Sequence, residues 1–81
     1  MNKRIGVVAI LVENKDSVDG VNKLLSTHAE IVVGRMGIPY KEKNLSVISI
    51  IVDGTNDEIG ALTGRLGRLH GVTVKSALTQ K

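Results

Sequence analysis

The chain has 81 residues, of which 42% are hydrophobic and 23% are charged, and its formal net charge is +3 at pH 7. So short a chain can bury only one core, and we therefore expect a single domain over residues 1–81. The sequence contains no cysteine, which excludes disulfides and thiolate chemistry, and Tyr40 is its sole aromatic residue, so the core must be aliphatic.

The first segment combines a basic start, from Met1 to Arg4, with an apolar run that ends at Val12. This order imitates a secretory signal. However, the run stops after about eight residues, and no small-residue cleavage pattern follows it. Its length and valine content instead predict a strand over Arg4–Val12. We therefore expect a cytoplasmic protein with no membrane-spanning segment.

A first helix is predicted after this strand. Asp16 is of a type that caps helices, and Asp19 follows three residues later. Apolar residues then recur at helical spacing, namely Val18, Val21, Leu25 and Ala29. The pattern predicts a helix from Asp16 to about Ala29.

The next segments are typical of a β-hairpin. Glu30–Pro39 predicts a second strand, and its final Pro39 favours an edge position, because proline cannot donate a hydrogen bond to a neighbouring strand. The polar residues Lys41–Asn44 predict a turn, and Leu45–Asp53 predicts the third strand.

A second helix is marked at its start by a capping box, in which Thr55 and Glu58 satisfy each other's backbone N–H groups. One face of this helix carries Ile59, Leu62, Leu66 and Leu69. Basic residues favour its final turn, namely Arg65, Arg68 and His70. Gly71 is predicted to be the C-terminal cap, and Val72–Leu78 the last strand.

The resulting order is β-α-β-β-α-β, the ferredoxin-like pattern. It predicts an α+β fold in which two helices lie on one face of a four-stranded antiparallel sheet. In this topology the second and fourth strands are the edges, which agrees with the proline at the end of the second strand.

The two central strands are apolar on both sides. In the first strand the two sets of alternate residues are Ile5, Val7, Ala9 and Leu11 against Val8, Ile10 and Val12. In the third strand they are Ile48, Ile50 and Val52 against Val47 and Ile51. Two helices can cover only one face, and an antiparallel sheet whose other face meets water should alternate apolar with polar residues. We therefore expect a homo-oligomer, a dimer or a tetramer, formed through the open face or an edge strand.

A stripe of glycines in the second helix also suggests a partner. Gly60, Gly64 and Gly67 fall on one side of the helix, and each costs about 1 kcal/mol relative to alanine. One interpretation is that another backbone or a ligand approaches closely there. The alternative is a weak helix with small exposed residues.

The segment from Gly34 to Tyr40 is the candidate for recognition. It combines two glycines with a guanidinium, a thioether, a proline and the only aromatic ring, at positions Gly34, Arg35, Met36, Gly37, Pro39 and Tyr40. Its backbone could hold a small ligand or contact a neighbouring subunit. The alternative is a bulged edge strand that the glycines bend.

Catalytic and metal sites are not predicted. The two imidazoles, His28 and His70, are far apart in the sequence, and no nucleophile, carboxylate pair or metal-ligand spacing accompanies them. We therefore expect no enzyme activity, no cofactor and no metal. The basic residues are interleaved with acidic ones, so we expect no autonomous binding to nucleic acid.

Two stretches carry a resemblance to a known family. At GRMGIPY, residues 34–40, and at NDEIGALTGRLGRLHGVTVK, residues 56–75, the sequence resembles the proposed iron-only hydrogenase system regulators. That family is similar to ACT domains and to the C-terminal domain of nickel-responsive repressors, which associate into dimers or tetramers. The resemblance implies a regulatory role, which includes control of transcription.

Two departures limit what the resemblance implies. The nickel-responsive repressors carry a separate DNA-binding segment, for which this chain has no room. They also bind nickel through a set of histidine and cysteine ligands that this sequence does not supply. ACT domains often bind amino acids near the turn after the first strand, but here that turn is Glu13–Asp16 and lacks their proline-glycine pair. The leading hypothesis is therefore a ligand-sensing regulatory module, and the alternative is an assembly domain without a small-molecule ligand.

Overall fold

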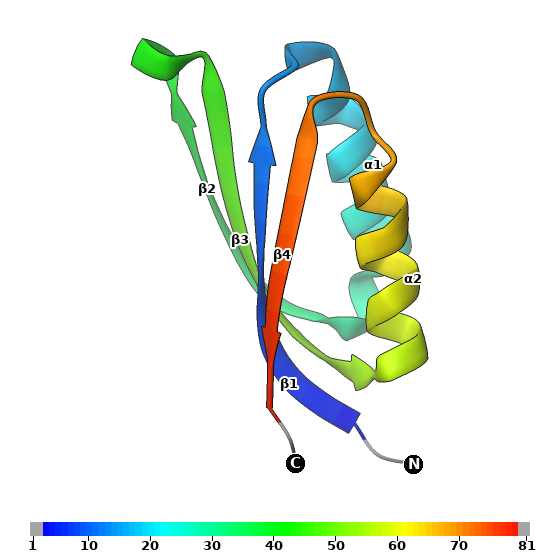
Figure 1. Ribbon diagram of the computed structural model, residues 1–81. Coiled ribbons are helices and arrows are strands. Elements are labelled where there is room, and N and C mark those ends of the chain that lie inside the picture. Colours follow the sequence, from blue (N-terminus) through cyan, green and yellow to red (C-terminus); the bar gives the residue numbers. More distant parts are fainter. Residues whose placement is uncertain (1–2, 80–81) are drawn as a thin grey trace.

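The computed structural model describes residues 3–79, so the first two residues of the basic start lie outside the described part of the chain. Four strands and two helices follow one another in the predicted order: β1 (Lys3–Val12), α1 (Val18–Thr27), β2 (Val32–Tyr40), β3 (Leu45–Thr55), α2 (Asn56–Gly67) and β4 (Val72–Leu78). Figure 1 shows both helices on the same side of the sheet. The predicted α+β, ferredoxin-like fold is confirmed.

The sheet has the strand order β2-β3-β1-β4, and each neighbouring pair is antiparallel. The two central strands, β1 and β3, are the apolar ones, and β2 and β4 are the edges. Pro39 accordingly lies in an edge strand, as predicted, near the end of β2. The predicted hairpin also forms, since β2 pairs directly with β3.

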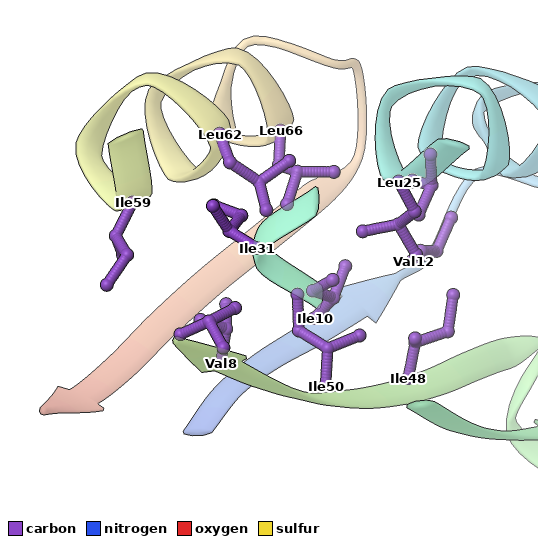
Figure 2. Close-up of a cluster of buried hydrophobic side chains, with 12 residues drawn as sticks. Val8, Ile10, Val12, Leu25, Ile31, Ile48, Ile50, Ile59, Leu62 and Leu66 are labelled. Atoms are coloured by element: carbon purple, nitrogen blue, oxygen red, sulfur yellow. The ribbon is translucent and has the colours of Figure 1, made fainter. Parts of the chain in front are cut away.

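The core fills the space between the sheet and the helices (Figure 2). Its buried side chains are all aliphatic: Val8, Ile10, Val12, Val21, Leu25, Ile31, Ile48, Ile50, Val52, Ile59, Leu62 and Leu66. The sheet contributes one residue in two from its central strands, because alternate side chains of a strand point to opposite faces. The helices contribute residues three and four apart, which share one face of a helix.

The start of the first helix differs from the prediction. Ser17, the N-cap residue of α1, makes no side-chain capping bond. Asn14 rather than Asp16 caps the turn before the helix, because the Asn14 side-chain oxygen accepts a hydrogen bond from the Asp16 N–H at 2.9 Å. This bond begins a short 3₁₀ turn, η1 (Lys15–Ser17), which leads into α1 at Val18. An asparagine is as good a cap as an aspartate, so sequence alone could not separate the two neighbours.

The end of the first helix was also predicted two residues too late. α1 ends at Thr27, since His28 leaves the helical conformation with φ −102° and ψ 27°. A second 3₁₀ turn, η2 (Ala29–Ile31), follows, and it buries Ile31 in the core. β2 therefore begins at Val32 rather than at the predicted Glu30.

The capping box of the second helix is confirmed. The Thr55 hydroxyl accepts from the Glu58 N–H at 3.1 Å, and the Glu58 carboxylate accepts from the Thr55 N–H at 2.8 Å. These hydrogen bonds to Thr55 hold the pKa of the Glu58 carboxyl below its ordinary value. β3 runs directly into this cap and ends at Thr55, two residues beyond the predicted end.

Gly71 is not the C-terminal cap of α2, contrary to the prediction. α2 ends at Gly67 with Arg68 as its cap, so that Arg65 alone of the three predicted basic residues lies in the last helical turn. Gly71 lies in the following turn with φ +71°, and a Cβ there would come within 2.8 Å of the Asn14 Cβ. The glycine is required because the turn before β4 packs closely against the turn after β1.

Candidate ligand-binding site

The predicted recognition segment, Gly34 to Tyr40, does not form one site, because its successive side chains point to opposite faces of the sheet. Arg35 pairs with Ile50 and lies on the helix side, where its guanidinium donates a hydrogen bond to the Asn22 side-chain oxygen of α1 at 2.9 Å. Met36 lies on the other side and is 66% exposed. The residues of this segment therefore lie on both faces of the sheet and do not converge on one site.

The edge strand β2 is bulged next to Gly34, which is one part of the alternative interpretation, whereas Gly37 pairs regularly with Ile48. The register of β2 against β3 shifts between Val32 and Gly34, which is a β-bulge. A Cβ at Gly34 would meet no atom within 4 Å, and one at Gly37 would make ordinary contacts with Ile48 at 3.6 Å and the Val47 carbonyl at 3.9 Å. A shallow hollow of about 330 Å³ lies beside the bulge, and its lining includes Gly34 and Arg35.

Pro39 and Tyr40 contribute to a better-defined hollow at the far end of the hairpin. It lies between the tip of the β2–β3 hairpin and the turn that follows β1, two parts that Figure 1 shows at the same end of the sheet. Its volume is about 490 Å³. We call it the hairpin cleft and define it by its lining residues, Val12, Lys15, Pro39, Tyr40, Lys41, Asn44, Leu45 and Ser46.

Long-range hydrogen bonds hold the β1 wall of the hairpin cleft, and a tight turn forms the hairpin wall. On the β1 side, the Ser17 hydroxyl donates to the His70 carbonyl at 2.6 Å, and the Glu13 N–H donates to the Gly71 carbonyl at 2.8 Å. These bonds fix η1, which carries Lys15. On the hairpin side, a 3₁₀ turn, η3 (Lys41–Lys43), ends at Asn44, whose left-handed conformation has φ 52° and ψ 45°. Asparagine tolerates this conformation better than most residues, so the turn suits its sequence.

The chemistry of the hairpin cleft is cationic at the surface and apolar below. Lys15 and Lys41 are exposed, while Val12 is only 2% exposed. Asn44 and Ser46 add neutral hydrogen-bonding side chains. No carboxylate is among the lining residues. Such a cleft can hold a small molecule that has an apolar body and an electron-rich end.

Sequence reasoning missed most of this cleft. Lys41–Asn44 carried only a turn signal, and Lys15 carried no signal of its own. The one usable clue was the neighbouring pair of Pro39 and Tyr40, which belongs to the predicted recognition segment. The approach of η1 to the hairpin depends on the tertiary fold.

The glycine stripe of α2 lines an open groove and is not in close contact with another part of the described chain. Gly60, Gly64 and Gly67 line a groove of about 520 Å³ together with β4 residues 72–76. A Cβ at any of the three would meet no atom within 4 Å. Nothing within residues 3–79 therefore approaches this stripe closely, and the predicted close approach of another chain or ligand stays a prediction.

The second face of the sheet carries exposed apolar side chains from three strands. They are Ile5, Val7 and Leu11 of β1, Met36, Ile38 and Tyr40 of β2, and Ile51 of β3, with exposed fractions between 37% and 66%. We call this surface the open face. Ser49, Asp53, Thr73 and Lys75 occupy other positions that the register places on the same face.

Both histidines make contacts that join separate elements of the fold. His28 lies 3.1 Å from the Arg65 guanidinium through its Nε2 atom, a contact that joins the end of α1 to α2. His70 offers its backbone carbonyl to Ser17. Across residues 3–79 no group of three or more histidine, aspartate or glutamate side chains is placed to hold a metal ion. The prediction that no metal is required stays a prediction.

Neither helix could cross a membrane, since no helix within the described residues is both long and apolar enough.

A family model for TM1266-like proteins, described as proposed iron-only hydrogenase system regulators, matches residues 4–76. The chain belongs to this family. The resemblance seen in the two sequence stretches is thereby confirmed. No curated protein matches the chain in sequence.

Solved structures support both the family and the fold. The uncharacterized protein TM1266 from Thermotoga maritima is 35% identical, with a TM-score of 0.92 over 98% of this chain and 100% of that one. The ACT domain of GTP pyrophosphokinase from Chlorobium tepidum superposes with a TM-score of 0.78 at 16% identity, over 94% of this chain and all of that domain. A proposed glycine cleavage system transcriptional repressor gives a TM-score of 0.71 at 12% identity, over all of this chain and 48% of that one. At such low identity the last two show a shared ACT-like fold.

Proposed function

We propose that this chain is a ligand-sensing regulatory module of an iron-only hydrogenase system and that it acts as a homo-oligomer in the cytoplasm. The observation that carries the proposal is the position of Tyr40. Tyr40 is one of the residues that line the hairpin cleft, and its register in β2 places its side chain at the end of the row of exposed side chains on the open face. A ligand in the cleft and a second copy on the open face would both contact it.

A shared contact residue is a physical basis for regulation. If ligand binding changes the rotamer or exposure of Tyr40, it changes the free energy of assembly, and by linkage assembly changes the affinity for the ligand by the same factor. The hairpin tip is suited to such a change. It leans away from β1 and from the helices (Figure 1), and residues 35–44 are all exposed.

Family membership and fold support a regulatory role. The family is described as proposed regulators of iron-only hydrogenase systems. Two proteins with the same fold are an ACT domain of a GTP pyrophosphokinase and a proposed transcriptional repressor. Since we expect no autonomous DNA binding, a transcriptional effect of this chain would pass through a protein partner. We expect no catalytic activity.

The open face supports assembly. An apolar surface of this extent on an antiparallel sheet is typically covered by another layer. The β4 edge with its groove offers a second surface, because β4 has seven residues without proline, glycine or a bulge, whereas β2 contains Pro39, two glycines and the bulge. One self-complementary contact gives a dimer, and two different ones give a tetramer.

An assembly domain without a small-molecule ligand is the second candidate. The open face favours it, because that surface requires a covering layer whether or not the hairpin cleft is occupied. The two candidates share the oligomer and differ only in the role of the cleft.

Thermal unfolding against a panel of amino acids, nucleotides, organic acids and divalent metals tests the first candidate. A ligand that binds only the native state adds about 2.7 kcal/mol to the free energy of unfolding when its concentration is 100 times its Kd. This added stability raises the melting temperature. Sedimentation equilibrium with and without that ligand then tests coupling to assembly. A flat panel together with a stable oligomer would favour the assembly domain, and an 8.7 kDa monomer under all conditions would contradict both.

A further inference from the structure

The two lysines of the hairpin cleft come from different elements. Lys15 belongs to η1 and Lys41 to η3, and the cleft lies between these two turns. Within residues 3–79 neither ammonium group makes an ion pair or a hydrogen bond. Glu42 lies next to Lys41 in η3, but it does not line the cleft. Asp16 likewise follows Lys15 in η1 and does not line the cleft. Two lysines therefore border one hollow whose lining residues include no acidic side chain.

The remaining lining residues describe the rest of a ligand. Val12, Pro39 and Leu45 are apolar lining residues, and Tyr40 is the aromatic one. Asn44 and Ser46 can donate or accept hydrogen bonds. The volume of about 490 Å³ lies within the range of roughly 300–1,000 Å³ that is usual for small-molecule sites.

We infer that the hairpin cleft binds a small organic anion whose carboxylate or phosphate group lies between Lys15 and Lys41 and whose apolar or planar body lies against Pro39, Tyr40 and Leu45. The inference rests on the proposed ligand-sensing function and names the class of ligand for it. A metal cation does not suit this site, because the lining residues offer ammonium groups and no carboxylate. A neutral apolar molecule would leave both charges without a partner.

The lysines also explain how the site would select among ligands. A primary ammonium group is a compact point charge with three donors, so it accepts both carboxylate and phosphate groups. Because both lysines are exposed, salt screens their attraction, and affinity for an anion should fall as ionic strength rises. Affinity for an uncharged analogue should not change in this way.

Titration calorimetry on the full chain, with pairs of probes that differ in charge, tests the inference. Adenosine monophosphate is compared with adenosine, and phenylacetate with phenylacetamide, while inorganic phosphate measures the contribution of the anion alone. We expect the charged member of at least one pair to bind at least roughly tenfold more tightly than its neutral partner, which is the effect of about one charge-assisted contact. The pair that responds distinguishes a phosphate ligand from a carboxylate ligand.

Two charge-matched double variants locate the binding. Lys15→Gln/Lys41→Gln removes both cleft cations, and Lys23→Gln/Arg68→Gln removes two cations that do not line the cleft. We expect the first variant to lose at least roughly tenfold in affinity for the charged probe and the second to lose less than about threefold. Both should retain the circular dichroism spectrum of the parent, because all four side chains are exposed.

The outcomes separate failure of the inference from failure of the proposed function. Equal affinity for charged and neutral probes, or equal losses in the two double variants, would overturn the anion site and leave ligand sensing intact. If none of the probes binds and the wider panel of ligands is also flat, ligand sensing itself fails and the anion site fails with it.

Discussion

The two faces of the sheet are built from the same residue types and yet have opposite environments. On the helix side, Val8 and Ile50 are fully buried, whereas on the open face their chain neighbours Val7 and Ile51 are 47% and 46% exposed. A valine and an isoleucine occur in each case. Residue hydrophobicity therefore suits both faces of the sheet for burial, and it does not decide which face is buried. The position of the two helices decides that, because they cover only one face.

The largest effect in this comparison is expected from a matched pair of isoleucines. Ile50→Ala should reduce the free energy of unfolding by about 2–5 kcal/mol, because it leaves a cavity in the core. Ile51→Ala should reduce it much less at protein concentrations where the chain is monomeric, since Ile51 already contacts solvent there. Urea denaturation of both variants measures the difference. Equal losses at every protein concentration would mean that the open face is covered within the folded chain itself.

A charge on the open face should separate the subunits without unfolding them. Val7 pairs with Ile51 at the centre of the open face, so Val7→Lys would place an ammonium group in a buried contact of the oligomer. We expect sedimentation equilibrium to show a folded monomer of about 8.7 kDa. The control is Lys23→Glu on the exposed side of α1, which should leave the oligomer unchanged. An intact oligomer in Val7→Lys would move the interface to the β4 edge.

The stability of the helix layer that covers one face of the sheet also depends on the N-terminal cap of α2. Thr55→Ala removes the hydroxyl that caps α2 and should cost about 1 kcal/mol of stability. Thr55→Ser, which keeps the hydroxyl, should recover most of the loss. Thermal unfolding compares the two, and a loss of the same size in both variants would show that the methyl group rather than the cap is responsible.

Acid should weaken the same cap. The hydrogen bonds with Thr55 hold the pKa of Glu58 below its ordinary value, so the folded state favours the ionised carboxylate. Its contribution is therefore fully present above the ordinary glutamate pKa and is lost as the pH falls through the lowered folded pKa. Unfolding measured as a function of pH for the parent chain and for Glu58→Gln should differ near neutrality and converge in acid. Parallel curves at all pH values would contradict this role.

The smallest effect is expected at the bond between Arg35 and α1. Because the contact with Asn22 is exposed, Arg35→Ala, Asn22→Ala and the double variant should each change stability by less than about 1 kcal/mol. A double-mutant cycle isolates the bond. Assembly and ligand affinity should be measured on the same variants, since Arg35 was a candidate recognition residue. If they weaken in Arg35→Ala but not in Asn22→Ala, Arg35 acts beyond this bond.

Much of the fold could be predicted because local signals agreed with one another. The apolar runs, the capping box at Thr55 and the proline of β2 each depend on residues that are close in sequence, and all were correct. The errors were at helix ends, at Asn14, His28 and Gly71. There, short 3₁₀ turns and a close approach between two turns decided the boundaries, and these depend on packing rather than on local preference.

The candidate site was less predictable for a related reason. Pro39 and Tyr40 were correctly placed on a strand end, but the segment that contained them was divided between two faces by the alternation of the strand. Lys15 and Lys41 become neighbours of one cleft only because β1 and the hairpin lie side by side in the sheet. A single sequence without its fold contains no sign of that approach.

The sequence by itself determined the order of strands and helices, the aliphatic nature of the core, the edge position of β2 and an excess of apolar surface beyond what two helices can cover. These properties follow from residue periodicity and from backbone chemistry, which act over a few residues. Only the tertiary structure decided which apolar face the helices cover, that Arg35 binds α1, and that two lysines from different elements border one cleft. Those outcomes depend on contacts between residues far apart in the chain, whose partners are selected when the sheet and helices pack together.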